Sequence, residues 1–352
     1  MAPSPTREEL AASYARSLAM QLPDQVASLA TLQFAGAFEN AKPWAIGPFQ
    51  RDEQLTFRRP AEWQDPTGIG WRSGALFNPS LIPDGPLLHL FYRASPRMET
   101  LDSRIGHAVY DSRTGEWQDN PSNPIVYPTH ENETWGCEDP KVFRGPDGFY
   151  LAYNGAWEVT PDQRRDYGAD LFSSDVGCDI KMMYSPDLRE WTKLGQVVPH
   201  DISMLWAKAA VVPRDGTGRA VPFDGKYHMY LSEGCGGKLT VGRSADLRSW
   251  KFEPVDYLDI SALGRLHEVS TALVLPGGRE FILDFFYEDE AGEYQAGQAL
   301  YEVSDPIHPL AISPAGILAW GGVIEWEGSW LFAQGWDAPV GVPEIYFYRA
   351  EL

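Results

Sequence analysis

Cysteine, basic residues and long apolar runs are all scarce in this chain of 352 residues. Its three cysteines, at 137, 178 and 235, are too few and too scattered for a disulfide framework or a zinc cluster. Lys and Arg number 29 against 49 Asp and Glu, a formal net charge of −20, so nucleic acids and anionic membranes are poor partners. No run approaches membrane-spanning length, and MAPSPTREEL carries charges where the apolar part of a signal peptide would begin. We therefore expect a soluble protein of the cytoplasm.

Several motifs for cofactor or nucleophile chemistry are also missing. The chain has no GxxxxGK[ST] phosphate loop, no dinucleotide-binding GxGxxG and no GxSxG nucleophile elbow. Its seven His residues show neither HxH nor HExxH spacing, and no loop motif supports a calcium ion in the acidic surroundings. We expect no cofactor and no bound metal.

What the chain has in abundance is aromatic strand sequence separated by tight turns. From about Gln54 onward, alternating segments such as LLHLFYR, FYLAYNG and FILDFFYED are bounded by Asp-Gly, Pro-Gly and Gly-Gly. The segment Ser-(Pro/Ala)-Asp-Leu-Arg-X-Trp occurs twice, and related units close at Trp117, Trp191 and Trp250. About five units of four strands fit, which predicts an all-β fold, a five-bladed β-propeller. A β-sandwich is the alternative. In the repeated turns, Asp187 and Asp246 should accept backbone hydrogen bonds, and the tryptophans should pack between blades.

The first residues follow a different pattern. Thr6 and Glu9 have capping-box spacing, and Leu10, Tyr14 and Leu18 recur every four residues, which predicts a helix that ends before Pro23. A second short helix is expected over 24–32. We divide the chain into a helical extension, residues 1–50, and a propeller catalytic domain, residues 51–352. The apolar stripe of the extension needs a partner surface, on the propeller or on a second subunit.

Loops at one end of a propeller converge on a pocket, so polar residues that interrupt strands near their ends are the candidate site. Most are acids or amides, and several adjoin Trp or Tyr, an arrangement that suits a sugar. The binding candidates are Asn78, Arg93, Arg104, Glu138, Asn154, Lys208, Glu233, His267, Tyr287 and Asp337.

Glu138 and Asp139 are adjacent acids followed by Pro140. Neighbouring side chains in a strand point to opposite faces, so we expect only one of the two carboxylates to face the pocket. Cleavage of a glycosidic bond needs two groups in different roles, one to protonate the leaving oxygen and one to deliver or activate a nucleophile. Acids from different blades can lie far enough apart to admit a water molecule, which predicts inversion.

The sequence from about Asn78 to the C-terminus resembles glycoside hydrolase family 130, five-bladed propellers that act on β-mannosides, mostly as inverting phosphorylases and in part as hydrolases. The most specific element is Glu138-Asp139-Pro140-Lys141 before a strand that ends in Tyr; Asn78-Pro79, Tyr92-Arg93 and Lys208-Ala209-Ala210 support it. The resemblance implies that Asp139 is the general acid, acting through a substrate hydroxyl, and that Asn78, Arg93 and Arg104 bind the sugar. It also implies a homo-oligomer, since members often associate through such extensions.

Departures from the family pattern concern the phosphate-binding residues. Tyr287-Glu288 stands where phosphorylases carry a Tyr-His pair, and an acid near Glu233 replaces a common arginine. A carboxylate repels phosphate but can activate water. We therefore interpret the chain as an inverting β-mannoside hydrolase with Asp139 as acid and Glu268 or Glu288 as base.

Two alternatives stay open. A phosphorylase using inorganic phosphate is the first, because Lys208 is kept and Arg164 and Arg165 lie near a phosphate position. A sugar-binding propeller without catalysis is the second. The DPKVF run is also similar to the sucrose- and fructan-cleaving propellers, but their nucleophilic Asn-Asp-Pro-Asn stretch is absent. The expected partners are an oligosaccharide and, in the first alternative, phosphate.

Overall fold

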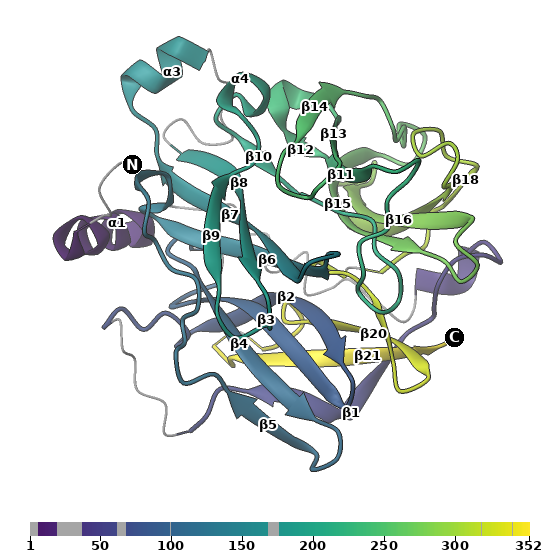
Figure 1. The fold of residues 1–352 in the computed structure, drawn as a ribbon, viewed down its shortest axis with the longest axis horizontal. Coiled ribbons are helices and arrows are strands. Elements are labelled where there is room, and N and C mark those ends of the chain that lie inside the picture. The colour runs from purple at the N-terminus through teal and green to yellow at the C-terminus, as the bar shows by residue number, and fades with distance from the viewer. Residues whose placement is uncertain are drawn as a thin grey trace.

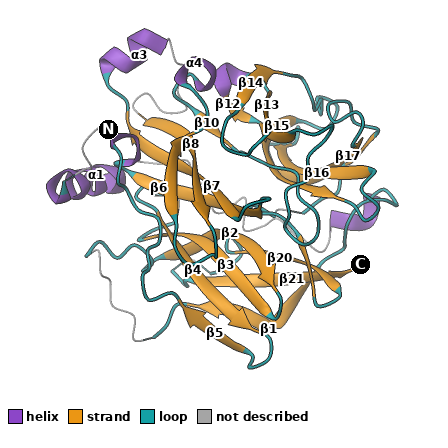
Figure 2. Cartoon of the chain, in the orientation of Figure 1, coloured by secondary structure: helices purple, strands orange, loops and turns teal. Residues whose placement is uncertain are grey.

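The computed structural model describes residues 6–19, 37–61, 68–98, 100–167, 176–317, 319–339 and 341–352. Its strands form five antiparallel blades arranged around a central axis, and the few helices lie outside the blades (Figures 1 and 2). The predicted propeller is confirmed, and the β-sandwich alternative is wrong.

The blades follow one another along the chain. Blade 1 contains β2 (Ala75–Asp84), β3 (Leu87–Ser95), β4 (Arg104–Asp111) and β5 (Glu116–Asp119). Blade 2 contains β6 (Gly136–Arg144), β7 (Phe149–Glu158), β8 (Val176–Ser185) and β9 (Thr192–Gln196). Blade 3 joins a β10 (Ala207–Lys208) and β12 (Glu233–Gly234) pair to β11 (Tyr227–Leu231), β13 (Thr240–Ser244) and β14 (Lys251–Pro254). Blade 4 contains β15 (Arg265–Val274), β16 (Glu280–Glu288), β17 (Tyr294–Glu302) and β18 (Ala311–Ser313).

The last blade closes the ring with a strand from the start of the propeller. It contains β19 (Ile324–Trp326), β20 (Ser329–Gln334) and β21 (Glu344–Glu351), and β1 (Gln50–Arg58) pairs antiparallel with β21. The first and the last strand of the propeller are therefore paired in one sheet, and this pairing closes the ring.

The repeated turn sequence has the structural role expected for it. Asp187 Oδ1 accepts from the backbone N–H of Arg189 at 2.9 Å, and Asp246 Oδ1 accepts from that of Arg248 at 2.9 Å. The Trp191 ring meets Phe91 of blade 1 edge-on at 5.5 Å. These residues fix the turns and the contacts between blades and do not belong to the site.

A buried arginine joins four of the blades near the axis. Arg214, 4% exposed, donates from its guanidinium to the carbonyl oxygens of Val142 in blade 2 and Gly321 before blade 5. Its backbone N–H donates to Ala272 O of blade 4 at 3.1 Å. A Cβ on Gly322 would lie 2.0 Å from this guanidinium, so glycine is needed there. The arginine thus links the backbones of blades 2 and 4 and of the segment before blade 5.

The N-terminal capping box is confirmed. Thr6 N donates to Glu9 Oε2 at 2.7 Å, Glu9 N donates to Thr6 Oγ1 at 3.2 Å, and helix α1 runs over Arg7–Ala19. The predicted second helix over 24–32 lies outside the described residues. The other helical segments are η1 (Ala37–Asn40), η2 (Glu131–Glu133), α3 (Pro161–Tyr167), α4 (His200–Ser203) and η3 (Cys235–Gly237). Within the described ranges, none of the helices combines the length and the apolarity that crossing a bilayer requires.

Candidate active site

The adjacent acids Glu138 and Asp139 lie on β6 at an irregularity of the sheet. The pairing of β6 with β7 shifts register between Glu138 and Lys141, and Asp139 has a left-handed φ of 51°. Strict strand alternation is therefore interrupted, and both carboxylates contact the same two cations. Strict alternation, the reason given for expecting only one of the two acids to face the pocket, does not hold here.

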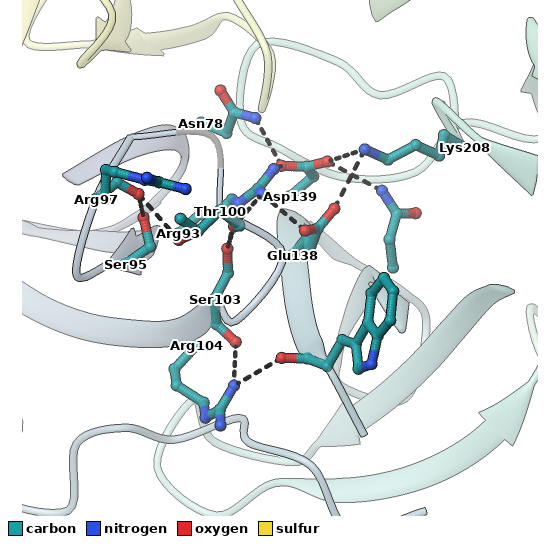
Figure 3. Close-up of polar contacts among 12 residues, drawn as sticks. Asn78, Arg93, Ser95, Arg97, Thr100, Ser103, Arg104, Glu138, Asp139 and Lys208 are labelled. Atoms are coloured by element: carbon teal, nitrogen blue, oxygen red, sulfur yellow. Dashed lines mark hydrogen bonds and ion pairs between the residues drawn. The ribbon is translucent and has the colours of Figure 1, made fainter. Parts of the chain in front are cut away.

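Arg93 of β3 and Lys208 of β10 are those two cations (Figure 3). Arg93 Nη2 lies 2.7 Å from Glu138 Oε1, and its Nη1 lies 3.0 Å from Asp139 Oδ1. Lys208 Nζ lies 3.2 Å from Glu138 Oε2 and 3.4 Å from Asp139 Oδ2. Glu138 is fully buried, whereas 10% of the Asp139 side chain is exposed. Glu138 thus anchors the cations, and Asp139 is the member of the pair that a ligand can reach.

Two amides complete the contacts of Asp139. Asn78 of β2 donates from Nδ2 to Oδ1 at 2.6 Å, and Asn154 of β7 donates from Nδ2 to Oδ2 at 3.1 Å. Trp336, beyond the end of β20, donates from Nε1 to Asn78 Oδ1 at 2.5 Å and so orients that amide. The tryptophan was not among the predicted residues, although its place in the run QGWDAP beside Asp337 could have drawn attention to it.

These contacts determine the charge of Asp139. Burial disfavours the ionised carboxylate, but Arg93 and Lys208 together with the Asn78 amide outweigh it and hold the pKa of Asp139 well below the usual range. Burial also opposes the charge on Lys208, but Glu138 and Asp139 raise its pKa well above the ordinary value. These contacts favour the ionised forms of both groups at neutral pH.

A second group of titratable residues adjoins this centre. Glu233 of β12, His267 and Glu268 of β15 each place a ligand-type atom within 4.8 Å of the others. Burial raises the pKa of Glu268 to about 8, partly opposed by Lys141, whose Nζ lies 3.7 Å from Glu268 Oε1. Burial likewise raises the pKa of Glu233, opposed by Lys208. Glu233 Oε1 accepts a hydrogen bond from Trp206 Nε1 at 3.3 Å. Burial therefore disfavours the charged forms of both glutamates.

Four other predicted residues have different surroundings. The Glu288 side chain is 32% exposed and pairs with Arg265, so its partner is a surface arginine and none of the residues bonded to Asp139. Tyr287 packs in the hydrophobic core of blades 3 and 4. Arg104 donates to the carbonyls of Ser103 and Trp135, at 2.8 and 3.3 Å, and so supports the backbone before Glu138. Asp337 accepts a hydrogen bond from the Tyr348 hydroxyl.

Comparisons with known proteins identify the family and the fold. Residues 51–234 match the model of glycoside hydrolase family 130, described as β-1,4-mannooligosaccharide phosphorylase. The matched range includes Asn78, Arg93, Glu138, Asp139 and Lys208.

Two curated relatives come from Thermoanaerobacter sp. (strain X514). A 1,2-β-oligomannan phosphorylase is 24% identical over 289 residues, 79% of this chain and 82% of the relative. A β-1,2-mannobiose phosphorylase is 30% identical over 132 residues, so this alignment spans only 38% of that relative and 34% of the chain.

Solved structures share the fold. One comes from work described as "The GH130 family of mannoside phosphorylases contains glycoside hydrolases that target beta-1,2 mannosidic linkages in Candida mannan". It superposes with a TM-score of 0.64 at 18% identity, covering 88% of this chain and 95% of the other. The family model matches more than half of the chain. The chain therefore belongs to glycoside hydrolase family 130, a family of enzymes that act on glycosides, and it has the five-bladed β-propeller fold of that family.

Proposed function

We propose that this protein cleaves β-mannosides with inversion, with Asp139 as general acid, and that water held by Glu268 and Glu233 is the nucleophile. The propeller, residues 51–352, is then the catalytic domain, and residues 1–50 are an extension that favours a homo-oligomer. We take the sugar class from the three relatives, because the name or description of each refers to mannose-containing substrates. We assign the acid to Asp139, a carboxylate of the buried centre that lies within the matched range.

The observation that carries the choice of water is the carboxylate pair Glu233 and Glu268. A phosphate dianion needs concentrated positive charge, and a carboxylate beside it is repulsive. Burial raises the pKa of both glutamates and disfavours any anion there, and above about pH 8 the ionised Glu268 also repels one. Lys208 and Arg93 are already paired with Glu138 and Asp139. A neutral water molecule meets no such repulsion, and an ionised carboxylate can take its proton.

Asp139 must gain a proton before it can act as an acid. Its contacts with the two cations and the amides favour the ionised form. A sugar hydroxyl that takes the place of Lys208 or Asn154 at Oδ2 would remove one stabilising contact and raise the pKa of Asp139. Proton donation therefore depends on substrate binding, which limits unproductive chemistry in the empty site.

Phosphorolysis is the second candidate, and the comparisons favour it. The family model and both curated relatives are described as phosphorylases, so the sequence-based preference for hydrolysis gains no support from them. Lys208 and Lys141 are cations close to the proposed nucleophile position. Of the two arginines considered for phosphate binding, Arg165 forms ion pairs with Asp162 and Asp166 of its own segment.

Product analysis on β-1,2- and β-1,4-mannobiose, with and without inorganic phosphate, tests the proposal. Hydrolysis predicts free mannose at the same rate in both buffers. If turnover requires phosphate, the reaction is phosphorolysis and the hydrolase assignment is wrong. Tight binding without any product would instead favour a sugar-binding protein. Asp139→Asn should lower turnover by about 10²–10⁴-fold, the usual cost of losing a general acid. Glu288→Gln, which alters a surface pair, is the matched control and should stay close to the wild type.

A further inference from the structure

We infer that Glu233, His267 and Glu268 form a binding site for one divalent ion of the Zn²⁺ class, and that the bound ion inhibits the enzyme. The three residues come from two blades, Glu233 from β12 of blade 3 and the other two from β15 of blade 4. Each offers a ligand-type atom, and these atoms lie within 4.8 Å of one another. Zinc ligands lie ~2.0–2.2 Å from the ion, and atoms within 4.8 Å of one another can be reached by one ion between them after side-chain adjustment.

His267 is held in position by its neighbours. Its ring stacks on Phe286 at 4.5 Å and meets Tyr294 edge-on at 5.5 Å. A ring fixed in this way loses little further freedom when it binds a metal. Its Nδ1 is buried and has no hydrogen-bond partner among the residues that the structure describes. A buried polar atom without a partner costs about 1–3 kcal/mol, so a ligand at this ring gains from satisfying it.

The donors and charges of the three residues also suit a cation. His267 offers a ring nitrogen and the two glutamates offer carboxylate oxygens. The two glutamates are buried close together, and Lys208, one of the two lysines beside them, already pairs with Glu138 and Asp139. A dication would relieve the repulsion between Glu233 and Glu268.

The ligand set indicates which ion. One imidazole with two carboxylates is a donor set that suits Zn²⁺ or Co²⁺. Ca²⁺ prefers six to eight oxygen ligands, and Mg²⁺ prefers octahedral oxygen and holds its own waters, so neither is favoured by this set.

The inhibition rests on the proposed function. An ion bound by Glu233 and Glu268 engages the carboxylates that are proposed to hold and activate the attacking water. Excess Zn²⁺ should therefore lower turnover, and a chelator should restore it.

Binding is tested on the full chain after chelator treatment, with no affinity tag. Calorimetry with Zn²⁺ and visible absorption of Co²⁺ should both give one site per chain. His267→Phe keeps the stacking on Phe286 and removes the nitrogen ligand. It should weaken affinity by at least about 100-fold, since loss of even an outer partner costs about 10–100-fold. Glu268→Gln should also weaken binding. His308→Ala, which removes an exposed histidine paired with Asp305, is the control and should leave binding unchanged.

The absence of binding in the wild type, or equal affinity in His267→Phe, would overturn the inference. Circular dichroism of each variant establishes that it is folded. The binding measurement does not depend on which reaction the enzyme performs. Tight binding that leaves turnover unchanged would overturn the inhibition and with it the role proposed for Glu233 and Glu268, while the metal site would stand.

Discussion

Replacement of Arg93 by methionine tests the electrostatic account of the site. The guanidinium lies 2.7 Å from Glu138 and 3.0 Å from Asp139, and only 5% of the residue is exposed. Methionine keeps an apolar stem over the Phe77 ring, which the guanidinium carbon now covers at 4.6 Å. Loss of the charge leaves two neighbouring carboxylates with Lys208 alone. Removal of one partner from a buried ion pair costs about 3–5 kcal/mol, and we expect a loss of that size in the free energy of unfolding at about pH 7.

The pH dependence of this loss has a defined sign. In the wild type the pKa of Asp139 is lowered. Its ionised form therefore stabilises the fold at pH values above the usual carboxyl pKa, and this stabilisation is lost as the pH falls toward the lowered pKa. In Arg93→Met the carboxylates of Glu138 and Asp139 repel each other, and protonation of one of them removes this repulsion. The difference between the two proteins should therefore shrink as the pH falls from about 7 to about 4.

Urea denaturation of both proteins over this pH range measures the difference. Arg165→Met is the matched control, because the Arg165 side chain is 68% exposed and its pair with Asp162 lies at the surface. Such pairs contribute about 0–1 kcal/mol. A loss below about 1 kcal/mol in Arg93→Met, or one that does not change with pH, would refute the reasoning.

Three further predictions follow from the described contacts. Glu133 is fully buried, with Lys193 Nζ at 2.6 Å and Lys181 Nζ at 3.3 Å. Burial opposes its charge, but the lysines lower its pKa to about 2, so Glu133→Gln should lose about 3–5 kcal/mol at neutral pH in urea denaturation, and the wild type should lose that contribution only as the pH falls toward 2. Trp336→Phe removes the donor to Asn78 and should lower kcat/KM about tenfold without loss of structure by circular dichroism, since one hydrogen bond contributes about 0.5–1.5 kcal/mol. Because burial raises the pKa of Glu268 to about 8 and a base must be ionised, kcat/KM for hydrolysis should fall as the pH is lowered through about 8; a flat profile down to pH 6 would remove Glu268 as base.

Sequence patterns predicted the architecture well because its signals are local. The alternation within strands, the turn residues and the Asp187 and Asp246 turns each depend on a few neighbouring residues. Five repeated units then leave few folds other than a propeller. The closure of the ring by β1 was beyond such reasoning, because it joins residues almost 300 positions apart along the chain.

The site was predictable in its membership more than in its geometry. Asn78, Arg93, Glu138 and Lys208 do surround Asp139, as strand-end positions suggested. Strand alternation failed at Asp139, because a left-handed residue at a register shift turns both acids toward the same cations.

Glu288 shows the limit of the strand-end argument. A strand end places a residue near the pocket but does not determine the partner of its side chain, and here Arg265 on the neighbouring strand pairs with it. Arg214 was not predicted for a related reason. Its hydrogen bonds go to backbone carbonyls that are distant in the sequence, and such acceptors are not predicted by any residue pattern.

The nature of the nucleophile is the central claim, and proton NMR of the first-formed product tests it most directly. The reaction is followed in phosphate buffer, before the released sugar mutarotates, with a β-mannobiose as substrate. The account predicts free mannose released as the α-anomer, because water attacks opposite to the bond that Asp139 protonates. A sugar 1-phosphate as the main product would contradict the roles given to Glu233 and Glu268.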